Sequence, residues 1–238
     1  MKIFIKSGLG LLLYFTLVIG IFAETKFIIG DRVEVYDDKT KKSYSAQILK
    51  IQPEGYLVHY DGYADSYDEV VPLTRLKEMA QIKGVSFVKS EKKKIIALSG
   101  NLKSGNILED LEWAESSSMA CWPGIRNVEF EGNQVYYWTD LPKKSTMIIT
   151  VKPKNNKTRI NLFAFSGFDP KYIPPNVYGA VSCEASHPSW IGEPDLTKPS
   201  EPQSVELRAV GNPYRVFIGV SGARDVLEGD YELTIEIK

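Results

Sequence analysis

The sequence predicts an all-β protein, and three observations support this. From Phe27 onward, apolar and polar residues alternate with a period of two, while a helical period is hard to find. The alternating segments are short and are separated by clusters of Gly, Pro, Asn, Asp and Lys. In the last segment, YELTIEIK, alternation is strict, so one face of that strand is expected to be buried and the other wet.

A long strand series begins near Ile95 and predicts a β-sandwich, because its segments recur at the spacing typical of that fold. The segments read QVYYWTDLP, TMIITVKP, RINLFAFSG, SVELRAV, YRVFIGVSG and YELTIEIK. The stretch from Phe168 to Gln203 holds most of the prolines. We therefore expect a long surface crossing between sheets there, and no central strand.

The first residues, MKIFIKSGLGLLLYFTLVIGIFA, have the pattern of a secretory signal peptide, with Lys2 and Lys6 before an apolar run that ends at Ala23. The strongly apolar part, Leu9 to Ala23, is shorter than the roughly 20 residues of a spanning helix. We therefore expect cleavage near Ala23 and a secreted, periplasmic or cell-envelope protein without a transmembrane segment. Losing the two lysines takes the formal net charge from −1 to −3.

The chain divides into four expected parts. These are the signal peptide at 1–23, a small strand unit at 24–78, a linker at 79–94 and the sandwich at 95–238. A short helix is expected at 73–81, on the way into the linker.

Cys121 and Cys183 are the only cysteines. In an exported chain, an isolated pair is more often a disulfide than a metal site or a nucleophile. We expect a bridge between them that stabilises the fold and takes no part in chemistry.

The stretch YLVHYDGYADSYDEVVP gathers tyrosines and carboxylates. Aromatic faces attract a methylated or quaternary ammonium through the ring quadrupole, and a nearby carboxylate adds charge attraction. Tyr60, Tyr63 and Tyr67 are the candidate rings, with Asp65 and Asp68 as supporting acids. Ordinary half-buried sheet tyrosines are the alternative interpretation of the same residues.

A fourth candidate ring is Tyr36. In RVEVY it lies opposite Val33 and Val35, which are the natural core residues, so it is expected to point away from the core of its own strand unit.

The segments GDRVEVYD, SAQILKI and YLVHYDGYADSYDEVVPLTRL resemble, in that order, the chromo-barrel or Tudor-knot family of small SH3-like barrels. The resemblance covers roughly residues 27–77 and implies an aromatic cage for methylated lysine at Tyr36, Tyr60, Tyr63 and Tyr67. Where members commonly carry Trp after the acidic pair, this chain has Val70, which affects either core packing or one cage wall.

The segments NVEFEGNQVYYWTDLPKKSTMIITVKP, NLFAFSG and NPYRVFIGVSGARDVLEGDYELTIEI resemble the bacterial pre-peptidase C-terminal domain, a jelly-roll-like sandwich. This implies a bacterial, exported and non-catalytic module that helps with surface attachment or export. Some relatives bind calcium, which makes Asp225, Glu228 and Asp230 candidate ligands. They lack a recognisable calcium-loop spacing, so we predict no metal site and no cofactor.

The sequence does not predict an enzyme. Its only histidines are His59, on a strand, and His187, in the proline-rich crossing four residues from Cys183. A Cys-His nucleophile is conceivable there, but a disulfide partner and a loop histidine fit better. No nucleophile elbow, zinc-protease motif, phosphate loop or Cys-x-x-Cys pair occurs.

The sequence therefore predicts an exported, non-catalytic binding protein whose small barrel holds a methylated lysine or quaternary ammonium ligand and for which the sandwich is dispensable. A structural or adhesive envelope protein, contacting an envelope partner through the proline-rich crossing, is one alternative. RNA binding by the barrel, helped by Lys89 and Lys92 to Lys94, is another. Nucleic acid is not the expected partner, because residues 27–77 carry seven Lys or Arg against nine Asp or Glu.

Overall fold

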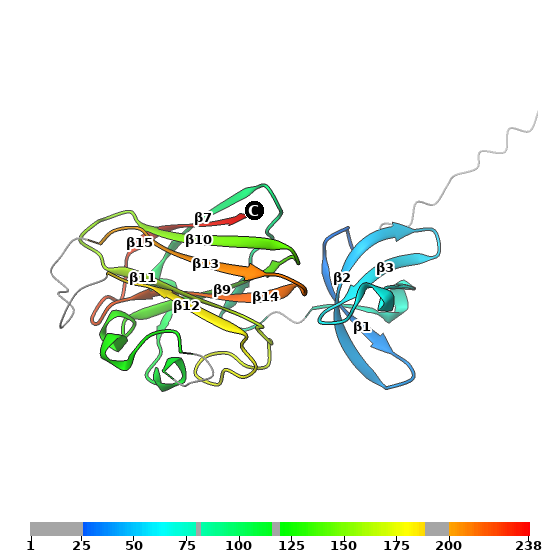
Figure 1. Ribbon diagram of the computed structural model, residues 1–238, viewed down its shortest axis with the longest axis horizontal. Coiled ribbons are helices and arrows are strands. Elements are labelled where there is room, and N and C mark those ends of the chain that lie inside the picture. The colour runs from blue at the N-terminus through cyan, green and yellow to red at the C-terminus, as the bar shows by residue number, and fades with distance from the viewer. Residues whose placement is uncertain (1–25, 80–81, 116–119, 189–199) are drawn as a thin grey trace, which may run out of the picture.

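The computed structural model describes residues 26–79, 82–115, 120–188 and 200–238. Figure 1 shows a small strand unit at one end and a larger two-sheet unit beside it. The helices among the described residues are short 3₁₀ turns, so the all-β prediction is confirmed. In that same part of the chain, no helix is long and apolar enough to cross a membrane. The predicted signal peptide, 1–23, lies outside the described residues.

The small barrel is the five-stranded sheet within residues 32–78, and its strands follow the order β4-β3-β2-β1-β5 with antiparallel pairing throughout. Its strands are β1 (Arg32–Asp37), β2 (Lys42–Gln52), β3 (Gly55–Tyr60), β4 (Glu69–Val71) and β5 (Leu76–Glu78). Alternate residues point inward, and Val33, Val35, Ala46, Ile48 and Val58 are buried. The register of β2 shifts after Ile48, an irregularity that bends the strand around this core.

The segment between the two units differs from its prediction. The expected helix at 73–81 is a single 3₁₀ turn, Leu73–Arg75, followed by β5, while 80–81 lie outside the described residues. The expected linker at 79–94 contains β6 (Val85–Phe87), which pairs parallel with a strand of the larger unit. The prediction missed β6 because GVSFVKS is a short apolar stretch before a run of lysines, and a strand of three residues gives little periodic signal.

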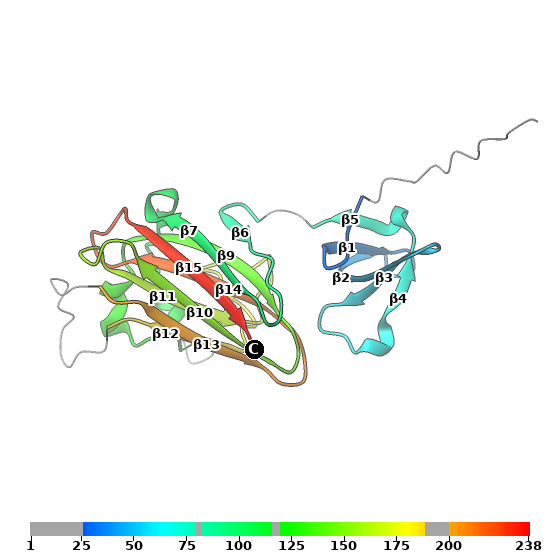
Figure 2. The same cartoon turned by 90° about the horizontal axis from the view of Figure 1, so that it is seen from above.

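The sandwich is the pair of sheets within residues 85–237, which Figure 2 shows from above. One sheet has the order β13-β10-β15-β7, and the other has the order β12-β11-β14-β9-β6 with β8 also paired to β9. The strands are β7 (Ile95–Asn101), β8 (Asn106–Ile107), β9 (Asn133–Leu141), β10 (Ser145–Pro153), β11 (Ile160–Ser166), β12 (Ser182–Ser186), β13 (Gln203–Ala209), β14 (Tyr214–Gly222) and β15 (Asp230–Ile237). Each of the six segments predicted as strands forms one.

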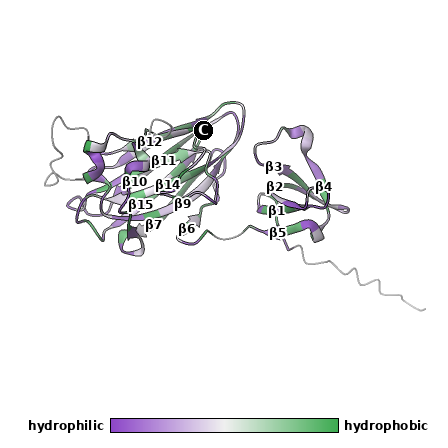
Figure 3. Cartoon of the chain, turned by 90° about the horizontal axis from the view of Figure 1, so that it is seen from below, coloured by the Kyte–Doolittle hydropathy of each residue, from purple (hydrophilic) through white to green (hydrophobic). Residues whose placement is uncertain are grey.

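The main core lies between these two sheets. The strict alternation expected for the last strand is present, since Tyr231, Leu233, Ile235 and Ile237 are buried on β15. Figure 3 shows hydrophobic residues alternating with hydrophilic ones along the strands of both units. In the four-stranded sheet, where buried and exposed residues alternate on β13 and β15, this is the pattern of a sheet with one wet face.

A second apolar cluster covers the outer face of the six-stranded sheet. Trp113, Trp122 and Phe130, from the 3₁₀-rich segment before β9, pack against Phe163 and Phe217. As a result β11 is buried on both faces. This cover was not predicted, because the segment that forms it has neither a helical nor a strand period.

The predicted disulfide joins Cys121 to Cys183. It ties the covering segment to β12, which lies in the proline-rich crossing and forms an edge of the six-stranded sheet. An edge is where a proline-flanked strand is tolerated.

Candidate ligand-binding site

Four tyrosine rings gather at one end of the small barrel. Tyr44 comes from β2, Tyr60 ends β3, Tyr63 follows in the loop and Tyr67 ends the 3₁₀ turn η1 (Asp65–Tyr67). Tyr44, Tyr60 and Tyr63 form a triangle with ring centroids 6.2, 6.2 and 6.4 Å apart and interplanar angles of 82°, 85° and 72°. Tyr67 lies 5.6 Å from Tyr63. We call these four residues the tyrosine cluster.

Strand alternation places two of these rings. Tyr60 pairs with Ala46, and Tyr44 is two residues before Ala46 on β2, so both share the inward face of the barrel. They extend the core beyond Val35, the strand partner of Tyr44, and are half-buried at its open end. The cluster is therefore the exposed margin of the barrel core.

The structure does not bring Tyr36 to this cluster. Tyr36 is one residue past Val35, so its side chain lies on the opposite face of β1, where Lys77 Nζ sits 5.8 Å from its ring centre. Its carbonyl oxygen accepts a hydrogen bond of 2.7 Å from Arg75 Nε. Tyr44 takes the fourth place instead. The signal for it is the period of two in SYSAQILKI, which sets Tyr44 in phase with Ala46.

The tyrosine cluster borders a pocket of about 590 Å³. Tyr63 and Tyr67 are the exposed walls, with 45% and 62% of their surface accessible. Four carboxylates and two cations also line the pocket: Asp37, Asp38, Asp68, Glu69, Lys39 and Arg75. The pocket thus combines aromatic faces with an excess of negative charge.

Glu69 connects the pocket's polar groups. The Tyr60 hydroxyl donates to Glu69 Oε1 at 2.6 Å, and Arg75 donates to both carboxylate oxygens at 3.0 and 3.3 Å. Burial opposes the charge of Glu69, but these bonds outweigh it and hold its pKa below the ordinary value. Burial and the bond to Glu69 raise the pKa of Tyr60, which stays neutral. Glu69 therefore locks one ring and is itself neutralised by Arg75.

Asp37 keeps its charge beside the rings. The backbone amide of Lys39 donates to it at 2.9 Å, and the Thr40 hydroxyl donates at 2.9 Å. These bonds hold the pKa of Asp37 below its ordinary value. Because its partners are uncharged donors, the carboxylate remains available to a cationic ligand.

The two predicted supporting acids have different places. Asp68 lines the pocket, and its Oδ1 lies 2.7 Å from His59 Nδ1. Asp65 is not among the pocket-lining residues and instead bonds Lys143 of the sandwich at 2.7 and 2.5 Å. Val70 is exposed on β4, outside both the barrel core and the pocket lining.

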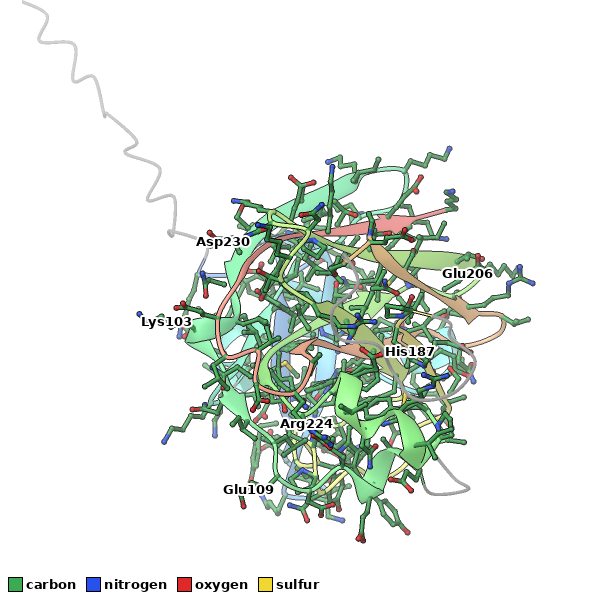
Figure 4. The ribbon with its side chains drawn as sticks, turned by 90° about the vertical axis from the view of Figure 1, so that its left-hand side faces the viewer. Lys103, Glu109, His187, Glu206, Arg224 and Asp230 are labelled. Atoms are coloured by element: carbon green, nitrogen blue, oxygen red, sulfur yellow. A yellow bond between two sulfur atoms is a disulfide. The ribbon has the colours of Figure 1, made fainter. Side chains whose placement is uncertain are left out.

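The other candidate groups do not assemble into a chemical site. His187 Nδ1 lies 3.1 Å from the carbonyl of Pro188, and Cys183 is in the disulfide. Among the described residues, no group of three or more His, Cys, Asp or Glu is placed to hold a metal ion. Figure 4, seen from the sandwich end, shows His187 and Asp230 well apart, and Asp230 accepts a bond of 2.9 Å from Asn101.

No family model matches the chain, and no curated protein matches its sequence. Solved structures show a low similarity over 65% of the chain. A periplasmic inhibitor of g-type lysozyme from Aeromonas hydrophila is 12% identical over 98% of its own length, with a TM-score of 0.34. A surface-associated copper-binding protein of Methylomicrobium album BG8 is 10% identical over 99%, with a TM-score of 0.38.

The pre-peptidase C-terminal domain of a Bacillus anthracis collagenase is also similar, at 10% identity over 94% of its length and a TM-score of 0.28. Similarities at this level assign no function. The fold and the pocket define the class: an all-β protein with a disulfide and a surface cluster of aromatic rings.

Proposed function

We propose that this is an exported, non-catalytic binding protein whose tyrosine cluster holds a methylated or quaternary ammonium group. The observation that carries the proposal is the triangle of Tyr44, Tyr60 and Tyr63. Their ring centres lie 6.2 to 6.4 Å apart at interplanar angles of 72° to 85°, so a cation seated among them comes within the roughly 6 Å range of cation–π attraction of more than one ring.

The same ring geometry also occurs in edge-to-face aromatic packing, which stabilises a fold without a ligand. Two features favour binding. The cluster opens to a pocket of about 590 Å³, and carboxylates of Asp37, Asp38 and Asp68 lie on that pocket. An onium group is attracted by the rings and the acids together, whereas a neutral ligand is attracted by the rings alone.

The resemblance to the chromo-barrel family supports the ligand class, with Tyr44 in place of Tyr36. At the position where family members commonly carry Trp, this chain has Val70. Val70 belongs neither to the barrel core nor to the pocket lining, so this difference leaves the tyrosine cluster unaltered. Export rests on the leader pattern of the first 23 residues, and the disulfide fits an oxidising compartment. We propose a periplasmic, secreted or cell-envelope protein of a bacterium.

Titration of the purified protein with a trimethyl-lysine peptide and with choline tests this function. We expect saturable shifts of the tyrosine ring signals in NMR spectra, and weaker shifts with 3,3-dimethylbutanol, the neutral analogue of choline. If millimolar peptide and choline leave every tyrosine signal unchanged, the proposed function is wrong.

A second candidate function is contact with an envelope protein through the proline-rich crossing. Tyr172 and Tyr178 pack there with centroids 5.7 Å apart, and Tyr178 is 76% exposed. Exposed tyrosines are common anchors in protein interfaces. A pull-down from envelope extract with the wild type and a Tyr178→Ser variant separates the two functions, since the cluster does not involve this residue.

A further inference from the structure

The loop between β3 and β4, residues 61–68, has two faces and is here called the ring loop. Tyr63 and Tyr67 form walls of the pocket on one face. Asp61 and Asp65 face the sandwich and are bonded to its side chains. The loop therefore lies between the ligand pocket and the junction of the two units, and Tyr63 borders both.

Asp61 anchors the start of the ring loop. Arg32 of the barrel and Arg215 of β14 both make close ion pairs with its Oδ2 atom. The two arginine side chains are only 7% and 9% exposed, and Arg32 also lies 3.5 Å from Asp140 of β9. Charges removed from water to this extent are screened little by salt, so the contact is a firm attachment.

Asp65 anchors the other end. Both of its carboxylate oxygens accept from Lys143 Nζ, at 2.7 and 2.5 Å. Lys143 lies in the turn between β9 and β10, and its hydrogen bond holds the pKa of Asp65 below the ordinary value. Since Asp65 begins the 3₁₀ turn that ends at Tyr67, this bond fixes the segment that carries the most exposed ring.

Apart from these two anchors, the ring loop is held by the bond between Asp68 and His59 and by the ring contacts of Tyr63. A 3₁₀ helix of one turn is weak, and η1 has no side-chain cap and no buried residue. A pocket whose walls must be ordered on binding loses affinity, whereas a pre-ordered one does not. A contact that orders Tyr63 and Tyr67 in advance therefore strengthens the site without touching the ligand.

We propose that the sandwich completes the ammonium site by fixing the ring loop, with Lys143 and Arg215 as positioning residues. This inference rests on the proposed function and replaces the expectation that the sandwich is dispensable. It also explains the role of Asp65, which anchors the ring loop to Lys143 and does not line the pocket.

A charge swap in the full-length protein tests the proposal. The single variants are Lys143→Asp and Asp65→Lys, and the double variant combines them. Lys154→Asp is the matched control, on an exposed sandwich lysine whose side-chain ammonium donates to the Ser99 hydroxyl. We expect each single variant to weaken trimethyl-lysine peptide binding about threefold to tenfold. The double variant should restore most of the loss, and the control should lose nothing.

Hydrogen exchange without ligand gives an independent measurement. The amides of Tyr67 and Asp68 donate within the 3₁₀ turn at 2.9 and 3.1 Å, so their exchange reports the order of the ring loop. Exchange should quicken in both single variants and recover in the double variant. Unchanged affinity or unchanged exchange in the single variants overturns the inference. If the wild type binds no peptide while exchange responds as expected, the proposed function is wrong and the anchoring of the loop by the sandwich stands.

Discussion

Replacing Tyr44 or Tyr36 by leucine separates the site seen in the structure from the site expected from the sequence. The two residues flank the same hairpin, but only Tyr44 contacts Tyr60 and Tyr63. Leucine keeps an apolar side chain of fair size and removes the ring quadrupole that attracts a cation. Tyr44→Leu should therefore weaken ammonium binding, and Tyr36→Leu should not.

The magnitude follows from the burial of the ring. A cation–π contact contributes about 0.5 to 1 kcal/mol at an exposed site and about 2 kcal/mol when desolvated. Tyr44 is half-buried, which places it near the middle of that range. We expect a loss of about 1 kcal/mol, which is a Kd raised about fivefold, for Tyr44→Leu. For Tyr36→Leu the change should stay below about twofold, because its ring lies on the other face of β1.

Isothermal titration calorimetry with a trimethyl-lysine peptide, and with the same peptide carrying a neutral tert-butyl analogue, measures both effects. The neutral analogue should lose little affinity in Tyr44→Leu, since it gains only apolar contact. Equal losses for the two peptides would show that the rings act by apolar contact and not by cation–π attraction. A loss confined to Tyr36→Leu would show that the ligand binds on the opposite face of β1.

Three further predictions concern stability and ionisation. In the sandwich interior, Arg159 Nε donates to the Glu129 carboxylate at 2.8 Å, and Glu129→Gln removes the negative charge of that pair. Urea unfolding should then give an unfolding free energy about 3 to 5 kcal/mol lower than that of the wild type. A loss under about 1 kcal/mol would contradict this. Cys121 and Cys183 are 62 residues apart, so reducing their bridge should lower the unfolding free energy by up to about 4 kcal/mol. Urea unfolding with and without reductant measures this, and equal urea midpoints would refute it. Burial raises the pKa of Tyr60 above its ordinary value of 10.0, so its contribution to stability is present below pH 10.0 and is lost as the pH rises through the folded-state pKa. Phenolate absorbance from Tyr60, identified by difference from Tyr60→Phe, should appear well above pH 10.0, and its appearance at an ordinary pKa would contradict the burial.

Strand positions were predictable because a period of two leaves a direct trace in the sequence. The six alternating segments named from the sequence all form sandwich strands, and β15 shows the same face buried that the alternation predicts, whereas the short strands β8 and β12 were not found. Strand β6 and the cover of Trp113 and Trp122 were not found. Both depend on which surfaces meet in three dimensions, and neither leaves a local period.

The site was predictable only in part, for a similar reason. Tyr60, Tyr63 and Tyr67 lie together because they are close along the chain, and the loop between β3 and β4 brings them around one pocket. The fourth ring depends on the register between β1 and β2. Val35 pairs with Tyr44, and a position one residue away on the same strand faces the other side. Family resemblance selected Tyr36, whereas the phase of β2 selects Tyr44.

The density of carboxylates in YADSYDE has a structural explanation that the sequence does not reveal. Asp65 meets Lys143, Asp68 meets His59 and Glu69 meets Arg75. Asp65 and Glu69 are in ion pairs with cations, so they attract a ligand less than free carboxylates do. Charge attraction at the pocket therefore comes mainly from the turn between β1 and β2. There, Asp37 and Asp38 have no ion pair within 4.0 Å among the described residues.

The strength of the site follows from these contacts and predicts the size of its ligand. Three or four tyrosines at about 0.5 to 1 kcal/mol each supply roughly 1.5 to 4 kcal/mol. A Kd of 1 mM needs about 4 kcal/mol, so the rings with a small contribution from Asp37 bring free choline only to the millimolar range. A peptide bearing trimethyl-lysine also contacts the surface around the pocket, and we expect it to bind at least about tenfold more tightly than choline in the same calorimetric assay. Equal affinities would show that the site recognises the onium group alone and would favour a small osmolyte or lipid head group over a protein tail.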